Sequence, residues 1–394
     1  MKRLGVLFLL AALLLAAPAT AGPPVHRATP WWHYNLTFWA PFDDARSPLR
    51  LLRGTGALTF TRAHDATHTA TYVHPGTGLV TVADNNQLRI EANGALIEGQ
   101  RTNSALRSAG MDNSVVWTAT GIAVTADQAV APDGTTTAEL LSATGANGTL
   151  LNSVTGTATA WTHSVYMKRK AGAGGVQVSA DNTTWTTCAI NSTTWTRCTD
   201  TRTLTAATYY FGIRIVTSGD NVYAWGGQME AGGAASSYIP TTTAAVTRNK
   251  DALLLPASNL SSTVGTLAVE FDFNGSLQYE RLLGNAADAG AGQIYIQPFG
   301  PTVIPNDGTP RTLNVVTAGN VPQRIGIAWS GTQIKGTTNG GTVAADVFGG
   351  NMGFDSSPIL GSNTAGGREI FGHLRNLRIW NRAFTDAELQ NITR

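Results

Sequence analysis

The sequence has little charge, and its positive and negative residues nearly balance. Charged residues make up 13% of its 394 residues, with 27 Lys and Arg against 25 Asp and Glu, and the formal net charge is +2. A chain this close to neutrality lacks the extended positive field that nucleic-acid-binding proteins present. Its densest basic stretch, MKRK at residues 167–170, is typical of the solvated end of a strand. We therefore expect no nucleic-acid partner.

Long apolar runs are missing as well, apart from one near the N-terminus. After the basic start MKR comes LGVLFLLAALLLAA, which is shorter than the ~20 residues that cross a bilayer. Residues 19–21 then form an A-x-A cleavage site. This pattern predicts a signal peptide over residues 1–21 and secretion of the mature protein. A single membrane anchor is the alternative interpretation.

The sequence has two cysteines, Cys188 and Cys198, too few for a cysteine-rich scaffold, and they lack the C-x-x-C spacing of redox motifs. They lie in WTTCAINSTTWTRC, where NTTWTTC and STTWTRC repeat at a fixed spacing. Thr, Trp and Ile favour strands, so we predict a hairpin with its loop at residues 191–195 and the two thiols opposite each other. In an oxidising compartment this arrangement favours a disulfide. Two small buried apolar residues are the alternative.

Short alternating segments, by contrast, are abundant. Examples are NLTFWAPFDD, LRIEA, YYFGIRIV, TLAVEFDFNG and RIGIAWSG, which are divided by turns rich in Gly, Pro and Asn. Strands at this spacing predict an all-β fold of antiparallel sandwiches.

The last segment predicts a strand followed by a short helix. Leu377 and Ile379 alternate with polar and aromatic neighbours, as in a half-buried strand. Thr385 precedes Glu388 by three residues, which is the spacing of a capping box at a helix N-terminus. Such an ending is typical of a sandwich whose last strand is held by a small helix.

A series of phrases occurs in order along the chain: TFTRAHDATHTATYV, LIEGQRTNSAL, VTADQAVAPDGTTTAELL, HSVYMKRKAG, VYAWGGQMEAGGAASSYIPTTTAAVTRNKD and GHLRNLRIWNRAFTDAELQ. Together they resemble a family of phage virion proteins of the tail-fibre or head-fibre type, over about residues 35–394. The resemblance implies two jelly-roll domains, a carbohydrate-binding-module-like β-sandwich followed by a concanavalin A-like (laminin-G-like) one. A secretory signal departs from this family and suggests a secreted bacterial product, or a virion part exported before assembly.

The resemblance also implies domain boundaries. Residues 22–98 hold N-terminal strands, 99–248 the carbohydrate-binding-module-like sandwich and 249–394 the concanavalin A-like jelly roll. LTFWAPFDD resembles the first strand of a concanavalin A-like sheet and LRNLRIW the last, and these two strands pair in such folds. Residues 22–98 are therefore a candidate first part of one discontinuous concanavalin A-like sandwich. Three consecutive units are the simpler alternative.

The strand LAVEFDFNG places two acids, Glu270 and Asp272, on one face. Concanavalin-fold β-glucanases carry an E-x-D-x-E or E-x-D-x-x-E strand, in which the first Glu is the nucleophile and the last the acid/base. Here the last position holds Asn274 or Gly275, and an amide cannot donate the proton. No G-x-S-x-G nucleophile elbow or dinucleotide-binding loop occurs. We therefore expect no catalytic residues and no enzyme activity.

Metal-binding signals are also weak. His64, His68 and His74 share parity, but only the first two could meet, through a turn, so we assign no metal site to them. Laminin-G-like folds often hold calcium, and the resemblance makes Asp272 and Asp355 candidate ligands, although no spacing signals it. We expect no cofactor, with calcium as the one candidate.

Binding to glycans is what the aromatic residues favour, because sugars stack their apolar faces on aromatic rings. Four tryptophans are candidate stacking platforms. Trp185 and Trp195 have few apolar neighbours in the Thr-rich repeat, and Trp31 and Trp32 stand in PWWHYN, outside any clear strand. Trp225, Trp329 and Trp380 alternate with apolar residues, as core residues do.

Three functions follow as hypotheses. The first is a non-catalytic glycan-binding adhesin, with a cell-surface or extracellular polysaccharide as its partner. The second is a structural virion or surface protein that contacts other assembly proteins or copies of itself, without sugar affinity. The third, which the sequence favours least, is a concanavalin-fold glycoside hydrolase.

Overall fold

The computed structural model describes residues 31–62, 70–273, 280–286, 290–297, 302–315, 322–363 and 367–394. The predicted signal peptide lies outside these ranges. Residues up to Tyr34 form a unit separate from residues 35–394, and its described part contains the 3-10 helix η1 (Trp31–His33). Among the described residues, no helix is long and apolar enough to span a membrane.

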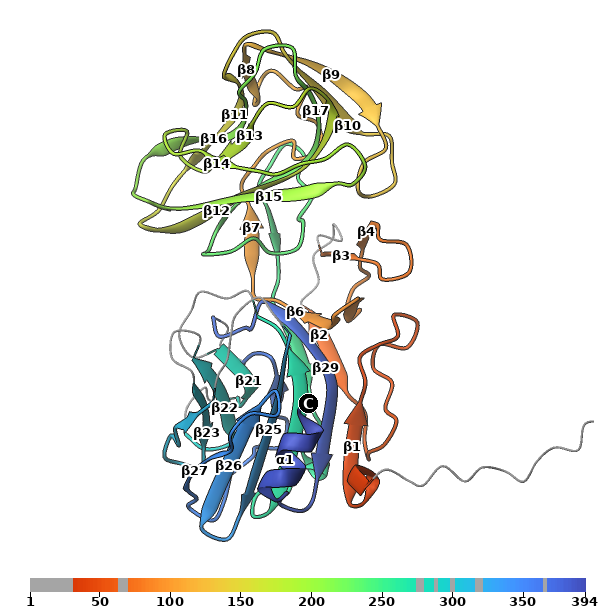
Figure 1. Cartoon of the computed structure of the whole chain (residues 1–394), viewed down its shortest axis with the longest axis vertical. Coiled ribbons are helices and arrows are strands. Elements are labelled where there is room, and N and C mark those ends of the chain that lie inside the picture. Colours follow the sequence, from red (N-terminus) through yellow and green to blue (C-terminus); the bar gives the residue numbers. More distant parts are fainter. Residues whose placement is uncertain are drawn as a thin grey trace, which may run out of the picture. The chain divides into compact units, whose positions relative to one another are not determined.

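Strands dominate the second unit, which confirms the predicted all-β sandwich class (Figure 1). One sandwich, here called the two-segment sandwich, is built from most of the strands at residues 36–97 and from those at residues 251–380. Its first sheet runs β27 (Ala344–Val347), β26 (Gln333–Thr338), β25 (Gln323–Ser330), β20 (Gly265–Phe271), β29 (Gly372–Trp380), β6 (Gly94–Ile97) and β5 (Arg89–Glu91), with β1 (Leu36–Ala40) also paired to β29. Its second sheet runs β2 (Thr59–Arg62), β19 (Asp251–Leu254), β28 (Ile359–Leu360), β21 (Glu280–Gly284), β22 (Gln293–Gln297), β23 (Thr302–Asn306) and β24 (Leu313–Asn314).

The two segments pair with each other in both sheets of this sandwich. Strands β1 and β6 pair with opposite ends of the last strand, β29, whose other edge pairs with β20, and β2 pairs with β19. Leu36, Phe38 and Ala40 alternate inward along β1, in the pattern that its sequence predicts. Phe38 and Ala40 join a single apolar core with residues of the second sheet such as Leu253 and Ile294.

The central sandwich is made of strands from residues 118–231. One sheet runs β14 (Thr186–Thr187), β13 (Val176–Ser179), β16 (Thr208–Ile215), β11 (Gly148–Thr155) and β8 (Thr118–Thr120). The other runs β15 (Thr196–Leu204), β12 (Thr159–Ala171), β17 (Asn221–Ala231), β10 (Ala138–Ala143) and β9 (Ile122–Ala129). Leu150 and Ile213 of the first sheet share a core with Val165 and Val222 of the second.

Two small antiparallel pairs accompany the sandwiches. Strands β7 (Arg101–Asn103) and β18 (Val246–Arg248) pair where the chain enters and leaves the central part. Strands β3 (Thr71–Val73) and β4 (Val80–Val82) form a hairpin, whose Val80 N–H donates to the carbonyl of Pro132.

Cys188 and Cys198 form the predicted disulfide, with their Cα atoms 5.7 Å apart. The predicted hairpin around them is wrong, because Cys188 follows β14 in one sheet of the central sandwich while Cys198 lies on β15 in the other. Each copy of the Thr-Thr-Trp repeat instead follows a turn. The side chain of Asp181 accepts from the N–H groups of residues 183 and 184, and that of Asn191 from those of residues 193 and 194. The disulfide therefore joins the two sheets of the sandwich.

The C-terminal segment folds as its sequence predicts. After β29, helix α1 (Asp386–Ile392) begins with the predicted capping box of Thr385 and Glu388. A second 3-10 helix, η2 (Ala257–Asn259), follows β19. The three tryptophans assigned to the core, Trp225, Trp329 and Trp380, are 2%, 0% and 0% exposed.

Candidate functional site

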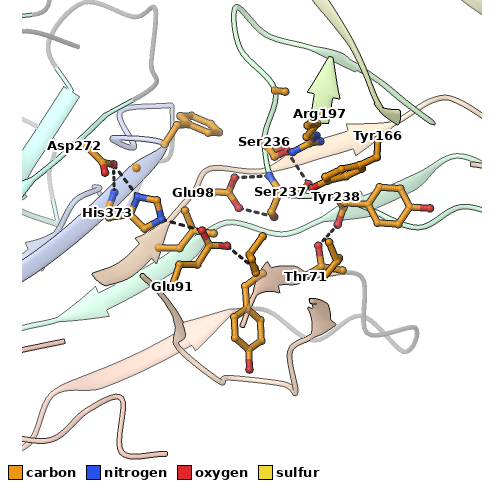
Figure 2. A pocket seen from close by; sticks show the side chains of 17 residues that line it. Thr71, Glu91, Glu98, Tyr166, Arg197, Ser236, Ser237, Tyr238, Asp272 and His373 are labelled. Atoms are coloured by element: carbon orange, nitrogen blue, oxygen red, sulfur yellow. Dashed lines mark hydrogen bonds and ion pairs between the residues drawn. The ribbon is translucent and has the colours of Figure 1, made fainter. Parts of the chain in front are cut away.

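A cavity of about 190 Å³, here called the cleft, lies where several parts of the chain meet (Figure 2). The two-segment sandwich contributes Glu91, at the end of β5, and His373 on β29. The central sandwich contributes Tyr166 on β12 and Arg197 on β15. The β3–β4 hairpin and residues 235–238, which follow β17, complete the lining.

His373 links two carboxylates of the cleft (Figure 2). Its Nδ1 lies 2.8 Å from Oδ1 of Asp272, and its Nε2 lies 3.1 Å from Oε2 of Glu91. The backbone N–H of His373 also donates to Oδ1 of Asp272, at 2.8 Å. Gly372 permits this close approach, because a Cβ at its position would overlap the carbonyl oxygen of Asp272.

The two carboxylates keep the imidazole charged. Burial by itself would lower the pKa of His373, but the hydrogen bonds and charges of Asp272 and Glu91 raise it to about 9. The other carboxylate oxygens are engaged too, since Glu91 accepts from the N–H of Val73 at 2.7 Å and Asp272 from the amide of Asn93 at 3.2 Å. A carboxylate oxygen can accept two hydrogen bonds, so these oriented groups retain capacity for a hydroxyl donor.

An aromatic ring and a guanidinium line the side of the cleft that the central sandwich supplies. The guanidinium of Arg197 lies over the ring of Tyr166, 5.3 Å from its centroid. Its Nη1 donates to the carbonyl of Ser236 at 2.7 Å, and its Nη2 donates to Oγ of Ser164 at 3.0 Å. These contacts fix both side chains of the pair in the lining.

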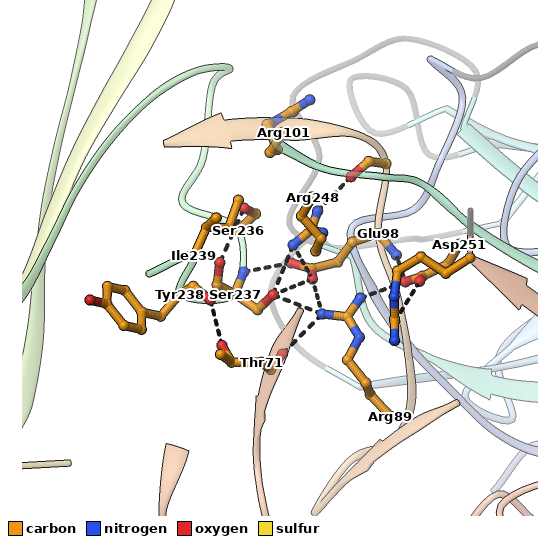
Figure 3. A network of polar contacts seen from close by, with 12 residues as sticks. Thr71, Arg89, Glu98, Arg101, Ser236, Ser237, Tyr238, Ile239, Arg248 and Asp251 are labelled. Carbon is orange, nitrogen blue, oxygen red and sulfur yellow. Dashed lines mark hydrogen bonds and ion pairs between the residues drawn. The ribbon is translucent and has the colours of Figure 1, made fainter. Parts of the chain in front are cut away.

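A buried charge network lies next to the cleft (Figure 3). Its charged members are Arg62, Arg89, Glu98, Arg248 and Asp251. Glu98 lies at its centre, where Oε2 accepts from Arg89 at 2.7 Å and from Arg248 at 2.6 Å. The backbone N–H and hydroxyl of Ser237 donate to the same carboxylate, each at 2.7 Å. Ser237 and Glu98 also line the cleft, so the network holds part of its lining in place.

The ion pairs shift the pKa values of Glu98 and Arg89. Burial would raise the pKa of Glu98, but Arg248 and Arg89 hold it well below its usual range. Burial would lower the pKa of Arg89, whereas Asp251 and Glu98 raise it. The network joins strands β2, β5 and β19 of the two-segment sandwich to β18 and to the segment after β17. It therefore ties together the chain segments that connect the two sandwiches.

The four candidate tryptophans come from different segments of the chain. Trp195 is half-buried beside the sheet of β12, where its Nε1 donates to the carbonyl of Val130 at 3.2 Å. Trp185 is half-buried under Arg214 of β16, which belongs to the opposite sheet. Trp31 and Trp32 lie in η1, in the separate unit, and the ring of Trp32 is 4.0 Å from that of His33. The side chain of Trp31 is outside the described part.

The candidate calcium ligands have separate partners. Asp272 binds His373, whereas Asp355 accepts from the N–H groups of Ala286 and Ser357, both at 2.9 Å. Within the described ranges, no group of three or more His, Cys, Asp or Glu side chains is placed to hold a metal ion. Of the sequence-selected histidines, His64 and His68 lie outside those ranges.

Glu270, the residue at the nucleophile position of the glucanase pattern, is held by its own neighbours. Its Oε1 accepts from the amide of Asn376 at 2.9 Å and lies 3.6 Å from Nε of Arg324. Asn274 and Gly275 lie outside the described residues.

Sequence reasoning selected Asp272 but missed its partners in the cleft. His373 is the second residue of the last strand and Glu91 is the last residue of β5, and neither position carries a local signal. They meet because β6 lies between β5 and β29 in the sheet, an order that the sequence alone does not show. The MKRK stretch was a usable signal, because Lys168 lies two residues after Tyr166 and therefore on the same face of β12.

Comparisons with known proteins give no family. No family model matches the chain, and no curated protein matches it. Among solved structures, the CBM40 of the Ruminococcus gnavus IT-sialidase, bound to α2,3-sialyllactose, is 18% identical, with 34% of this chain and 83% of that chain covered and a TM-score of 0.29. Domain 4 of AbnA, a GH43 extracellular arabinanase from Geobacillus stearothermophilus in complex with arabinotriose, is 16% identical, with 41% and 82% covered and a TM-score of 0.30.

A third similar structure is the CBM22-1 xylan-binding domain of Paenibacillus barcinonensis Xyn10C. It is 15% identical, with 34% of this chain and 94% of that chain covered and a TM-score of 0.25. Each of these three likenesses covers less than half of this chain.

Proposed function

We propose that the protein is a non-catalytic glycan-binding protein and that the cleft is its sugar site. The observation that carries this proposal is the pairing of Tyr166 and Arg197 on one side with the oriented carboxylates of Glu91 and Asp272 on the other. A sugar ring has an apolar face for stacking and hydroxyl groups for hydrogen bonds, and the cleft offers a partner for each.

The size and the charge of the cleft suit a small ligand that is neutral or weakly charged. Its volume of about 190 Å³ is below the roughly 300–1,000 Å³ of pockets for drug-sized ligands. We infer that the cleft takes one sugar residue of a longer glycan. The positive charge of His373 offsets part of the negative charge of Asp272 and Glu91, so these groups serve as hydrogen-bond acceptors for hydroxyls.

The non-catalytic part of the proposal is supported by the surroundings of the two acids on LAVEFDFNG. Glu270 is bound by Asn376 and lies near Arg324, while Asp272 is bound by His373. Retaining and inverting glycosidases need one carboxyl group that is protonated and can donate to the leaving group. The position that would carry this group in the glucanase pattern holds Asn274 or Gly275, and neither side chain can donate the proton.

We further propose an extracellular setting, as a secreted surface protein or an exported part of a virion fibre. The disulfide between Cys188 and Cys198 supports an oxidising compartment, and the N-terminal pattern MKR with its apolar run supports export. The partner would then be a cell-surface or extracellular polysaccharide.

A structural role is the second candidate, and the buried charge network favours it. Ion pairs such as Arg89–Asp251 and Arg248–Glu98 tie together the segments that connect the two sandwiches, as a rigid spacer requires. In this case the protein would bind assembly partners or copies of itself and no sugar.

To test the proposal, binding of the purified protein to an array of bacterial and plant polysaccharides is measured with and without calcium. We expect saturable binding that Tyr166→Ala and Arg197→Ala weaken by about tenfold or more, the range for loss of a stacking or charged contact. Tyr210→Ala is the matched control, because Tyr210 is 54% exposed on β16 of the opposite sheet. Binding that all three variants retain would place the sugar site elsewhere, and no binding would favour the structural role.

A further inference from the structure

Two residues of the cleft lining, Tyr166 and Arg197, belong to the sheet formed by β15, β12, β17, β10 and β9, on the face opposite to the core of the central sandwich. In this sheet Tyr166 pairs with Arg197 on one side and with Trp225 on the other. Two residues along β12, Lys168 pairs with Tyr223. Since successive residues of a strand alternate between faces, these side chains share the face that bears Tyr166.

Basic and aromatic side chains interleave on this face, here called the basic face. Nζ of Lys168 lies 4.9 Å from the ring centroid of Trp195 and 5.8 Å from that of Tyr223. Nζ of Lys170 lies 5.7 Å from the centroid of Tyr223. Such cation–π contacts hold the ammonium groups near the rings and limit the entropy that is lost when a ligand binds. Arg197 extends the row of cations to the cleft.

The cations of the basic face have no carboxylate partner within the part of the chain that the structure describes. Arg197 donates to a carbonyl and a hydroxyl, and the two lysines contact aromatic rings. Most other arginines and lysines that form ion pairs do so at 2.5–3.1 Å from an acid, as Lys335 does with Asp386. The charges of Lys168 and Lys170 therefore remain available to an external anion.

We propose that the basic face is the part of the glycan site that recognises acidic polysaccharides, through their carboxylate or sulfate groups. This inference rests on the proposed function, since one sugar residue occupies the cleft and the anionic residues that follow it lie along Lys168, Tyr223 and Lys170. Each anionic group would accept charge-assisted hydrogen bonds from an ammonium group, and sugar rings would contact Tyr223 and Trp195. The formal net charge of only +2 favours a polysaccharide over a nucleic acid, which requires many phosphate contacts.

The test compares ligands of different charge on the full chain. The probes are polygalacturonate for carboxylate, dextran sulfate for sulfate, neutral dextran, and a single-stranded oligonucleotide, at low and high NaCl. We expect an acidic polysaccharide to bind best, with affinity that falls as salt rises, because salt screens exposed charges. The double variant Lys168→Gln/Lys170→Gln is expected to bind it about tenfold more weakly or worse.

The charge-matched control is Arg324→Gln/Lys335→Gln, which removes two cations from β25 and β26 of the two-segment sandwich. It is expected to bind like the unmodified protein. If neutral glycans bind and the lysine variant is unaffected, the inference is overturned while the proposed function stands. Preferential binding of the oligonucleotide overturns the inference in favour of a nucleic-acid ligand. If no polysaccharide binds at all, the proposed function fails with it.

Discussion

The Nε2 atom of His373 lies 3.1 Å from Oε2 of Glu91, although 282 positions separate the two residues. Asp272 binds the other ring nitrogen, so the imidazolium is held between two carboxylates. This contact joins β5 to β29, the last strand of the sheet, at the edge of the cleft. The carboxylates that we propose as hydrogen-bond acceptors for a sugar therefore also form a stabilising ion pair, and we expect pH to affect both roles.

The first prediction is a loss of stability at alkaline pH that depends on His373. Its folded-state pKa of about 9 lies above the ordinary value of 6.5. The contribution of its charge to the free energy of unfolding is therefore complete below about pH 6.5 and is lost as the pH rises through 9. The difference between 9 and 6.5 corresponds to about 3 kcal/mol. Chemical denaturation from pH 6 to 10 is expected to show this loss in the unmodified protein and a much flatter profile in His373→Gln.

The control for this prediction is His74→Gln, because His74 is partly exposed in the β3–β4 turn and its Nδ1 accepts only from the N–H of Gly76 among the described residues. This variant should keep the alkaline transition. Equal alkaline profiles for His373→Gln and the unmodified protein would contradict the assignment of an imidazolium between the two carboxylates.

The second prediction concerns the charge network. Glu98→Gln removes the carboxylate that Arg89 and Arg248 share, so two buried guanidinium groups lose a counterion. Breaking a buried ion pair in this way costs about 3–5 kcal/mol. Urea denaturation should show this loss, whereas Lys335→Met, which breaks an exposed pair with Asp386, should cost less than about 1 kcal/mol. If both variants lose a similar amount of unfolding free energy, the buried ion pairs of the network stabilise the protein no more than an exposed pair does.

Local signals predicted the elements of this fold because they depend on neighbouring residues alone. The alternation of Leu36, Phe38 and Ala40 and the capping box of Thr385 and Glu388 are both observed. In each case the deciding contacts lie within one strand or one helical turn.

Sequence patterns predicted less well which strands pair with each other. The repeated Thr-Thr-Trp phrases favoured a hairpin, but Asp181 and Asn191 cap local turns, and the strands that follow join different sheets. The disulfide was predicted correctly even so, because a sandwich can bring Cys188 and Cys198 together across its two sheets. The cleft could not be predicted, since His373 and Glu91 meet only through the strand order of a sheet.

The third prediction is that the disulfide stabilises the central sandwich. The Cys188–Cys198 bond spans 10 positions, and closing a loop of that size stabilises a fold by about 2–3 kcal/mol in the chain-entropy treatment. Cys188→Ser/Cys198→Ala should lose this amount in denaturant, and a reductant should lower the stability of the unmodified protein but not of the variant. A reductant effect on both proteins would show that it acts elsewhere than on this bond.

The fourth prediction is a loss of stability at acid pH that depends on His163, a fully buried residue of β12 whose ring lies 5.1 Å from that of Phe211. Burial lowers its pKa to about 3, below the ordinary 6.5, so the unfolded chain binds a proton in this range while the folded chain does not. The free energy of unfolding is therefore unaffected by His163 above about pH 6.5. It falls by about 1.4 kcal/mol for each pH unit as the pH drops from there toward 3.

Denaturation curves of the unmodified protein and of His163→Leu between pH 7 and 4 measure this effect. As the pH falls, we expect the free energy of unfolding of the unmodified protein to decrease steadily relative to that of the variant, because leucine has no group that titrates. His74→Gln again serves as control and should follow the unmodified protein, since His74 is partly exposed. A difference that stays constant with pH would mean that His163 is protonated inside the folded sandwich, and the core around Phe211 would then have to contain a partner for its charge.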